Sequence, residues 1–87
     1  MFKTYVLFSK CLRHYYIGHT EDLNKRFVDH NKGKVRSTRR GIPWSIVYAE
    51  NHSTRQDAHK RELQIKAYKG GVAFKKLINV NCGSVPK

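Results

Sequence analysis

The sequence predicts a small α/β domain of the α+β type, in which helices flank a three-stranded antiparallel sheet in the order β-β-α-β-α-α. Two β-branched and aromatic runs stand close together near the N-terminus, a third follows a segment with glycines and a proline, and two helical patterns come after capping residues. Eighty-seven residues with 39% hydrophobic content leave room for one core. We therefore predict a single domain over residues 1–87, with its core at about 3–78 and a loosely held tail at 79–87.

The first two strands are predicted to form an antiparallel hairpin. Residues 4–9 and 15–19 are joined by a short polar segment. Alternation places Tyr5 and Leu7 on one face of the first strand and Val6 on the other. Because both faces carry large apolar groups, we expect this strand to be central and covered on both sides.

A short helix follows the hairpin. Thr20 is a favourable N-cap, and the next two residues, both acidic, suit the first turn. From there Leu23, Phe27 and His30 lie on one helical face, and Arg26 neighbours His30 at its edge. Either Arg26 and His30 are solvated groups on the surface of an amphipathic helix, or they belong to a functional site.

Residues 31–43 are predicted to be a loop, because Gly33, Gly41 and Pro43 interrupt the segment and no apolar periodicity survives. The loop is basic, and so is the chain, whose 18 Lys and Arg against 6 Asp and Glu give a formal charge of +12. Such a balance commonly serves nucleic acid, with acidic proteins, anionic membranes or a solvated loop as alternatives. Phosphate contacts are expected from Lys25, Lys32, Lys34, Arg36, Arg39 and Arg40.

The second half of the chain begins with a strand over residues 44–50, in which Trp44, Ile46 and Tyr48 share a face by alternation. A helix then starts at Ser53, with Gln56 able to complete a capping box. We expect this helix to run to about Lys69 and to end at Gly70-Gly71, and a third helix to cover residues 72–78.

Glu62 stands on the apolar side of the second predicted helix. At about 100° per residue it falls within about 60° of Ala58 and Ile65, which should face the sheet. A carboxylate beside a buried stripe needs a partner. One option is a metal ion, because Mg²⁺ commonly takes only one or two protein carboxylates. The other is an ion pair within the helix, with Arg55, Arg61 or Lys66.

No stretch is apolar enough to cross a bilayer, and the N-terminus lacks the apolar region of a signal peptide. We therefore expect a cytoplasmic protein without membrane contact. Cys11 and Cys82 form no CxxC pair, which argues against a zinc site or a disulfide framework. We expect two reduced thiols without a special role.

Together these residues resemble the GIY-YIG nuclease family, especially its small stand-alone members and the N-terminal nuclease domain of the excinuclease. The second half of the family signature is present as Tyr16-Ile17-Gly18, and the first half is reduced to Lys3-Thr4-Tyr5. The resemblance covers roughly residues 3–78. The position after the glycine varies in the family, and His19 there is assigned no role.

The resemblance implies a catalytic set made of Tyr5, Tyr16, Arg26, His30 and Glu62. Glu62 would hold Mg²⁺, or Mn²⁺ in its place, and Arg26 would bind the scissile phosphate. Tyr16 would orient or deprotonate the attacking water, with help from Tyr5 or His30. His30, with an ordinary pKa of about 6.5, is the alternative base.

The implied function is a Mg-dependent DNA endonuclease that acts in repair or recombination and prefers a DNA structure to a sequence. The alternative is a module of the same fold that binds DNA or RNA without catalysis. The sequence contains no separate DNA-binding domain, so we expect targeting to come from this unit, from a partner protein or from a homodimer.

Overall fold

The computed structural model describes residues 1–69 and 71–81, and its strands and α-helices follow the predicted order. The strands are β1 (Phe2–Ser9), β2 (His14–Thr20) and β3 (Trp44–His52). The helices are α1 (Leu23–Asn31), α2 (Arg55–Ala67) and α3 (Val72–Asn81), with a 3-10 helix, η1 (Arg36–Gly41), between α1 and β3. None of the described helices is long and apolar enough to span a membrane.

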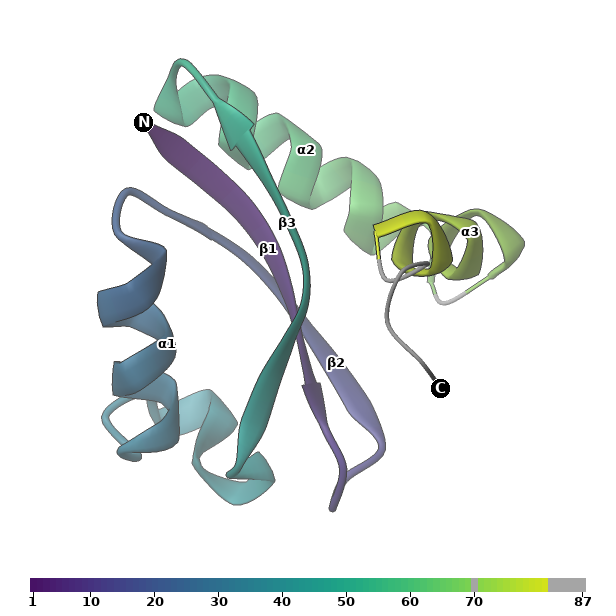
Figure 1. The fold of residues 1–87 in the computed structure, drawn as a ribbon. Helices are drawn as coiled ribbons and strands as arrows, with labels where there is room; N and C mark the ends of the chain where they lie inside the picture. The colour runs from purple at the N-terminus through teal and green to yellow at the C-terminus, as the bar shows by residue number, and fades with distance from the viewer. Residues whose placement is uncertain (70, 82–87) are drawn as a thin grey trace.

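The sheet is antiparallel with the strand order β2-β1-β3, so β1 is central as predicted. Figure 1 shows α1 with η1 on one side of the sheet and α2 with α3 on the other. Tyr5 and Leu7 pack with Trp44 on the α1 side, while Val6 packs with Ile65 of α2 on the opposite side. Each such buried side chain stabilises the fold by about 1.5–3 kcal/mol relative to exposure. The alternation along β1 thus builds two cores.

The predicted alternation along the third strand is wrong in its second half. Val6 lies opposite Tyr48 and Leu7 lies opposite Ile46, so Val47 is an extra residue at a β-bulge. Trp44 consequently belongs to the core on the α1 side, whereas Tyr48 packs against the core on the α2 side. The strand also continues two residues beyond the predicted end.

Both predicted helix starts are shifted toward the C-terminus. The N-cap of α1 is Asp22, whose carboxylate accepts from the Lys25 amide at 3.1 Å, and Thr20 instead accepts from the Asp22 amide. The N-cap of α2 is Thr54 rather than Ser53, and its hydroxyl accepts from the amide of Asp57. In each case a second residue with a capping side chain follows one or two positions later, and this later residue is the N-cap.

The helix ends also differ from expectation. The second helix ends at Ala67, and Lys69, with φ of 51°, adopts the left-handed conformation expected of a glycine. Gly70 lies outside the described residues. The third helix extends to Asn81, so residues 79–81 of the predicted tail are helical. The rest of that tail, with Cys82, lies outside the described residues, while Cys11 is a free, exposed thiol.

The predicted loop at residues 31–43 is wrong where η1 forms. The Trp44 indole donates to the Thr38 carbonyl at 2.7 Å, and the Asn31 side chain bonds both the amide and the carbonyl of Trp44. A β-carbon on Gly41 would lie 2.4 Å from the Trp44 ring, so only glycine permits this contact. Packing on Trp44 therefore orders a segment that has no apolar periodicity.

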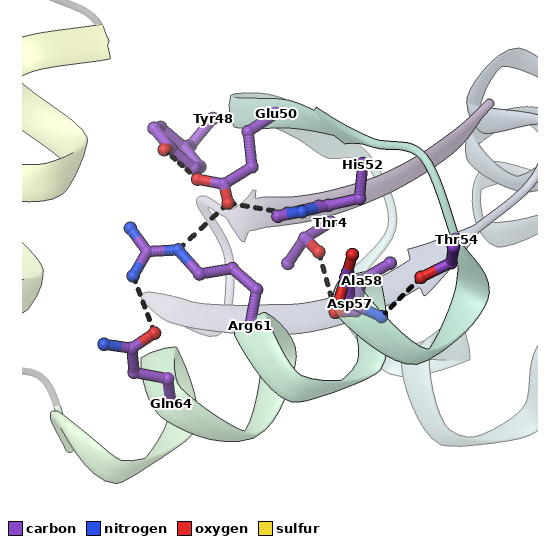
Figure 2. A network of polar contacts seen from close by, with 9 residues as sticks. All are labelled: Thr4, Tyr48, Glu50, His52, Thr54, Asp57, Ala58, Arg61 and Gln64. Carbon is purple, nitrogen blue, oxygen red and sulfur yellow. Dashed lines mark hydrogen bonds and ion pairs between the residues drawn. The ribbon is translucent and has the colours of Figure 1, made fainter.

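A polar network joins strand β3 to helix α2 (Figure 2). The Glu50 carboxylate accepts from Arg61 Nε at 3.0 Å, from His52 Nε2 at 2.8 Å and from the Tyr48 hydroxyl. These contacts hold the pKa of Glu50 below its ordinary value, although burial alone would raise it. The network links α2 to β3 through Arg61 and Glu50.

Candidate active site

The Tyr5 phenol and the His30 imidazole form the buried centre of the site. Tyr5 is 1% exposed and His30 has no exposed surface, so the possibility that His30 is a solvated surface group is wrong. The Tyr5 oxygen lies 3.2 Å from His30 Nε2, and His30 Nδ1 lies 2.7 Å from the Thr38 hydroxyl. Strand β1, helix α1 and η1 therefore meet at this imidazole.

The direction of these hydrogen bonds follows from Thr38. Its hydroxyl donates to the Val35 carbonyl, so it accepts from His30 Nδ1–H. His30 Nε2 is then the unprotonated nitrogen, and Tyr5 donates its hydroxyl proton to it. Both nitrogens of the imidazole are occupied by protein groups.

Tyr16 completes the aromatic cluster from the edge strand β2. Its ring centroid lies 4.9 Å from that of His30, 6.3 Å from that of Tyr5 and 6.3 Å from that of Trp44. Tyr16 is only partly buried, unlike Tyr5. The more accessible of the two phenols is thus the one from the intact Tyr-Ile-Gly half of the motif.

Arg26 adds a positive charge beside the phenols. Burial would lower its pKa, but the neighbouring Tyr5 and Tyr16 hydroxyls outweigh burial and raise the pKa of Arg26 further above its ordinary value. The guanidinium is partly exposed on α1, so it remains charged and open to an anionic ligand.

The two buried groups are held in their neutral forms. Burial, with Tyr16 adding to it and Arg26 opposing it, raises the pKa of Tyr5 to about 12. Burial and the charge of Arg26 lower the pKa of His30 below its ordinary value. At neutral pH a neutral imidazole therefore accepts a hydrogen bond from a protonated phenol.

Glu62 faces inward from α2, as its position on the helix predicts, and it is 8% exposed. Its Oε1 lies 2.5 Å from His19 Nδ1, and its Oε2 accepts from Lys66 Nζ at 2.6 Å. Burial would raise the pKa of Glu62, but these two partners hold it below the ordinary value. Of the three cations considered from sequence, Lys66 is the partner, while Arg61 pairs with Glu50.

Glu62 and the aromatic cluster lie on the two sides of the edge strand β2. Tyr16 and Gly18 lie on the side of the sheet that α1 covers, whereas His19 carries its side chain to Glu62 of α2. Burial is the main cause of the raised pKa of Tyr5, and the charge of Glu62 adds a smaller part. The carboxylate of Glu62 is hydrogen-bonded to His19 and Lys66 rather than to the phenols.

Three potential metal ligands converge at Glu62. One ligand atom from each of His19, His59 and Glu62 lies within 4.8 Å of the other two. A carboxylate that remains ionised suits a divalent ion such as Mg²⁺, and one such ligand is sufficient when water and phosphate complete the shell. The residues present therefore fit a divalent metal.

The predicted phosphate-contacting side chains are exposed on α1, on η1 and on the turn between them. Lys25 pairs with Asp29 at 3.2 Å, and Arg39 Nε donates to the Gly33 carbonyl at 3.0 Å. Lys32, Lys34, Arg36 and Arg40 are exposed as well. These charges lie on the same side of the sheet as Arg26.

The family model of the GIY-YIG catalytic domain matches residues 1–72, most of the chain. The chain belongs to the GIY-YIG family. This family has a nuclease fold, and its nucleases typically use divalent metals. The resemblance inferred from the sequence motifs is confirmed.

The curated relatives are UPF0213 proteins, which are small stand-alone members of the GIY-YIG family. UPF0213 protein SERP0126 of Staphylococcus epidermidis is 41% identical over 54 residues, which are 61% of this chain and 66% of that protein. The match thus spans just under two thirds of that relative. UPF0213 protein SSP2268 of Staphylococcus saprophyticus is 36% identical over 70 residues, which are 78% of this chain and 85% of that protein.

Among solved structures, the solution NMR structure of the UPF0213 protein BH0048 from Bacillus halodurans is 25% identical to this GIY-YIG domain. It covers 87% of this chain and 94% of its own, with a TM-score of 0.46.

Sequence reasoning does not find the residues that support the predicted set. Thr38, which orients His30, lies in the segment predicted to be a loop, and His59 belongs to no predicted site. His19 follows the motif glycine without an assigned role, although it contacts Glu62. The His-x-x-Glu spacing of residues 59 and 62 is a signal that could identify His59, because i and i+3 lie on one helical face.

Proposed function

We propose that this GIY-YIG domain is an endonuclease that hydrolyses DNA phosphodiester bonds with a divalent metal ion. One arrangement supports the proposal most strongly. The Arg26 guanidinium stands beside the Tyr5 and Tyr16 phenols, and an ionised, inward-facing Glu62 lies on the other side of the same edge strand. In this arrangement Arg26 would bind the phosphate, Tyr16 would activate the water and Glu62 would bind the metal.

In this proposal Arg26 binds the scissile phosphate. Its planar guanidinium presents several N–H donors at fixed angles, which match phosphate oxygens, and it is permanently charged. Charge that develops on the phosphate during attack is stabilised by such a prepositioned cation.

We propose that Tyr16 orients or deprotonates the attacking water. His30 has no exposed surface and both of its nitrogens are engaged, which disfavours it as the base. Tyr5 donates its proton to His30 and, with a pKa of about 12, stays protonated at neutral pH. Tyr5 and His30 are therefore positioning residues, and the partly exposed Tyr16 is the phenol that orients or deprotonates water.

Glu62 would hold the metal, Mg²⁺ or Mn²⁺, which when bound supplies charge neutralisation at the phosphate. The protein's part is to keep the carboxylate ionised, which Lys66 and His19 do through their contacts.

DNA would be bound along α1 and η1 through phosphate contacts. Such contacts carry no sequence information by themselves, so we propose a preference for DNA structure and a role in repair or recombination. We also propose that a partner protein or a second copy of the chain directs the domain to its DNA target.

A nicking assay tests the proposal. Supercoiled plasmid and branched DNA are incubated with the protein and Mg²⁺, with EDTA and Glu62→Gln as the inactive controls. The matched variant is Glu50→Gln, which alters a second partly buried carboxylate that pairs with a cation on α2. We expect the wild type and Glu50→Gln to nick DNA, and Glu62→Gln to lose activity by about 10² or more. Equal activity of wild type and Glu62→Gln would contradict the proposal.

One observation favours a second candidate, a nucleic-acid-binding module without catalysis. Both oxygens of Glu62 already have protein partners, His19 and Lys66. Binding to these substrates without nicking of any of them would support this alternative, and competition with RNA would then identify the preferred nucleic acid.

A further inference from the structure

The environment of Glu62 contains more nitrogen than a magnesium site requires. His19 Nδ1 lies 2.5 Å from Glu62 Oε1, and the His19 and His59 rings lie 5.1 Å apart between centroids. With Glu62, they bring three ligand atoms within 4.8 Å of one another. Two of the three potential ligands are therefore imidazoles.

The three residues come from two packed elements. His59 and Glu62 are three residues apart on α2, which places them on one helical face, and His19 reaches them from β2. His59 is exposed, His19 is partly exposed and Glu62 is buried, so solvent reaches part of the group. A metal ion there would have free positions for water or a ligand.

The ligand chemistry selects among divalent ions. Mg²⁺ prefers oxygen ligands, whereas imidazole suits Fe²⁺, Ni²⁺, Cu²⁺ and Zn²⁺. The affinity of such a site for divalent ions rises along the first transition row to copper. A site with two imidazoles and one carboxylate that keeps open positions is a common arrangement for these ions.

We infer that His19, His59 and Glu62 form a site for a first-row transition-metal ion and bind such an ion in preference to Mg²⁺. His19 and Glu62 would hold the ion in place of their direct hydrogen bond, which joins Nδ1 and Oε1. Lys66 stays on the other carboxylate oxygen, Oε2, where it fixes the orientation of Glu62. The catalytic use of this ion rests on the proposed function, but its binding does not.

Co²⁺ is a suitable probe, because its visible absorption changes when nitrogen ligands bind. The full chain, freed of metal with EDTA, is titrated with Co²⁺, and Mg²⁺ is then added as a competitor. His59→Ala is the principal variant, since His59 is exposed and its loss should not affect folding. His19→Ala is the second variant. The matched control is His52→Ala, which removes a histidine from a similar pair, with Glu50 at 2.8 Å.

We expect wild type and His52→Ala to bind Co²⁺ equally. Loss of an outer partner of a ligand weakens metal binding by about 10- to 100-fold, so loss of the ligating His59 or His19 should weaken it by at least as much. Mg²⁺ in about hundredfold excess should fail to displace Co²⁺. Equal affinity of wild type and His59→Ala, or ready displacement by Mg²⁺, would overturn the inference.

The nicking assay separates this inference from the proposed function. Cleavage with Mg²⁺ by a protein that binds no Co²⁺ would contradict the inferred metal preference and would support the nuclease proposal. Co²⁺ binding that depends on His59, in a protein that nicks no DNA with any metal, supports the site and rejects the nuclease.

Discussion

Gly18 lies directly opposite Tyr5 in the β1–β2 ladder, and a β-carbon at position 18 would come within 2.8 Å of the Tyr5 hydroxyl oxygen. It would also lie 3.2 Å from the Tyr16 ring. The glycine of the Tyr-Ile-Gly motif is therefore required by the close approach of two phenols, rather than by a turn or by a positive φ.

Gly18→Ala should displace the Tyr5 ring and break its hydrogen bond to His30. Overpacking of this kind costs about 1–3 kcal/mol of unfolding free energy, and we expect cleavage to be lost as well. Urea denaturation measures the first effect and plasmid nicking the second.

The combined variant Tyr5→Phe with Gly18→Ala is the control. The added methyl group would contact the Tyr5 hydroxyl, which Tyr5→Phe removes, and the ring carbon Cζ, which phenylalanine keeps, so the two stability losses should add only in part. Strict additivity would mean that residue 18 does not act through Tyr5.

Periodicity was sufficient to predict the sheet. The runs at 4–9 and 15–19 form the hairpin, and large residues on both sides of β1 predict its central place correctly. What periodicity missed is local. The extra residue Val47 at the bulge changes the face of Tyr48, and η1 is ordered by Trp44 rather than by any pattern of its own.

The placement of the candidate site residues could be predicted where these residues share one element. Arg26 and His30 lie one turn apart on α1, and Glu62 lies on the inner face of α2. The contacts of Thr38 with His30 and of His19 with Glu62 join different elements, so spacing along the chain does not reveal them.

His30 should make the fold sensitive to mild acid. Its folded-state pKa lies below the unfolded value of about 6.5, because burial and Arg26 oppose its charge. Above about pH 6.5 the imidazole of His30 is unprotonated in both the folded and the unfolded state, so its full contribution to stability is present. Below this pH the unfolded state binds more protons than the folded state, and stability falls until the pH has passed the folded-state pKa. Unfolding free energies should therefore decline from about pH 6.5 downward.

His30→Gln is expected to be less stable at neutral pH and to lose this part of the pH dependence. His14→Gln, which alters an exposed histidine at the start of β2, is the control and should keep it. A wild-type profile that is parallel to that of His30→Gln between about pH 4.5 and 6.5 would show that His30 does not carry the effect.

Arg61→Ala should destabilise the protein without affecting catalysis. It leaves the Glu50 carboxylate without its closest permanent cation, and lost hydrogen bonds to charged groups cost about 1.5–3 kcal/mol. Denaturation should show the loss, while nicking per folded molecule stays at the wild-type level. A defect in nicking beyond the folded fraction would place this network in the site.

The salt dependence of DNA binding tests the role of η1. Arg36→Ala with Arg40→Ala removes two exposed guanidinium groups and spares Arg39, whose Nε donates to the Gly33 carbonyl. If both contact phosphates, the slope of log affinity against log salt should flatten by about 1.8. Lys60→Ala, an exposed cation on α2, should leave the slope unchanged. A flattened slope with Lys60→Ala alone would place the DNA on the other side of the sheet.

Arg26 should matter for cleavage far more than for binding. One phosphate contact among many adds little to affinity, so Arg26→Ala should bind DNA within a few-fold of wild type while nicking falls by about 10² or more. Arg26→Lys keeps the charge but loses the planar arrangement of donors, so its rate should fall between the two. Arg55→Ala, which removes a guanidinium 5.1 Å from the Phe2 ring centroid, is the matched control and should retain activity. Nicking that falls only as far as binding falls would mean that Arg26 holds DNA without acting on the scissile phosphate.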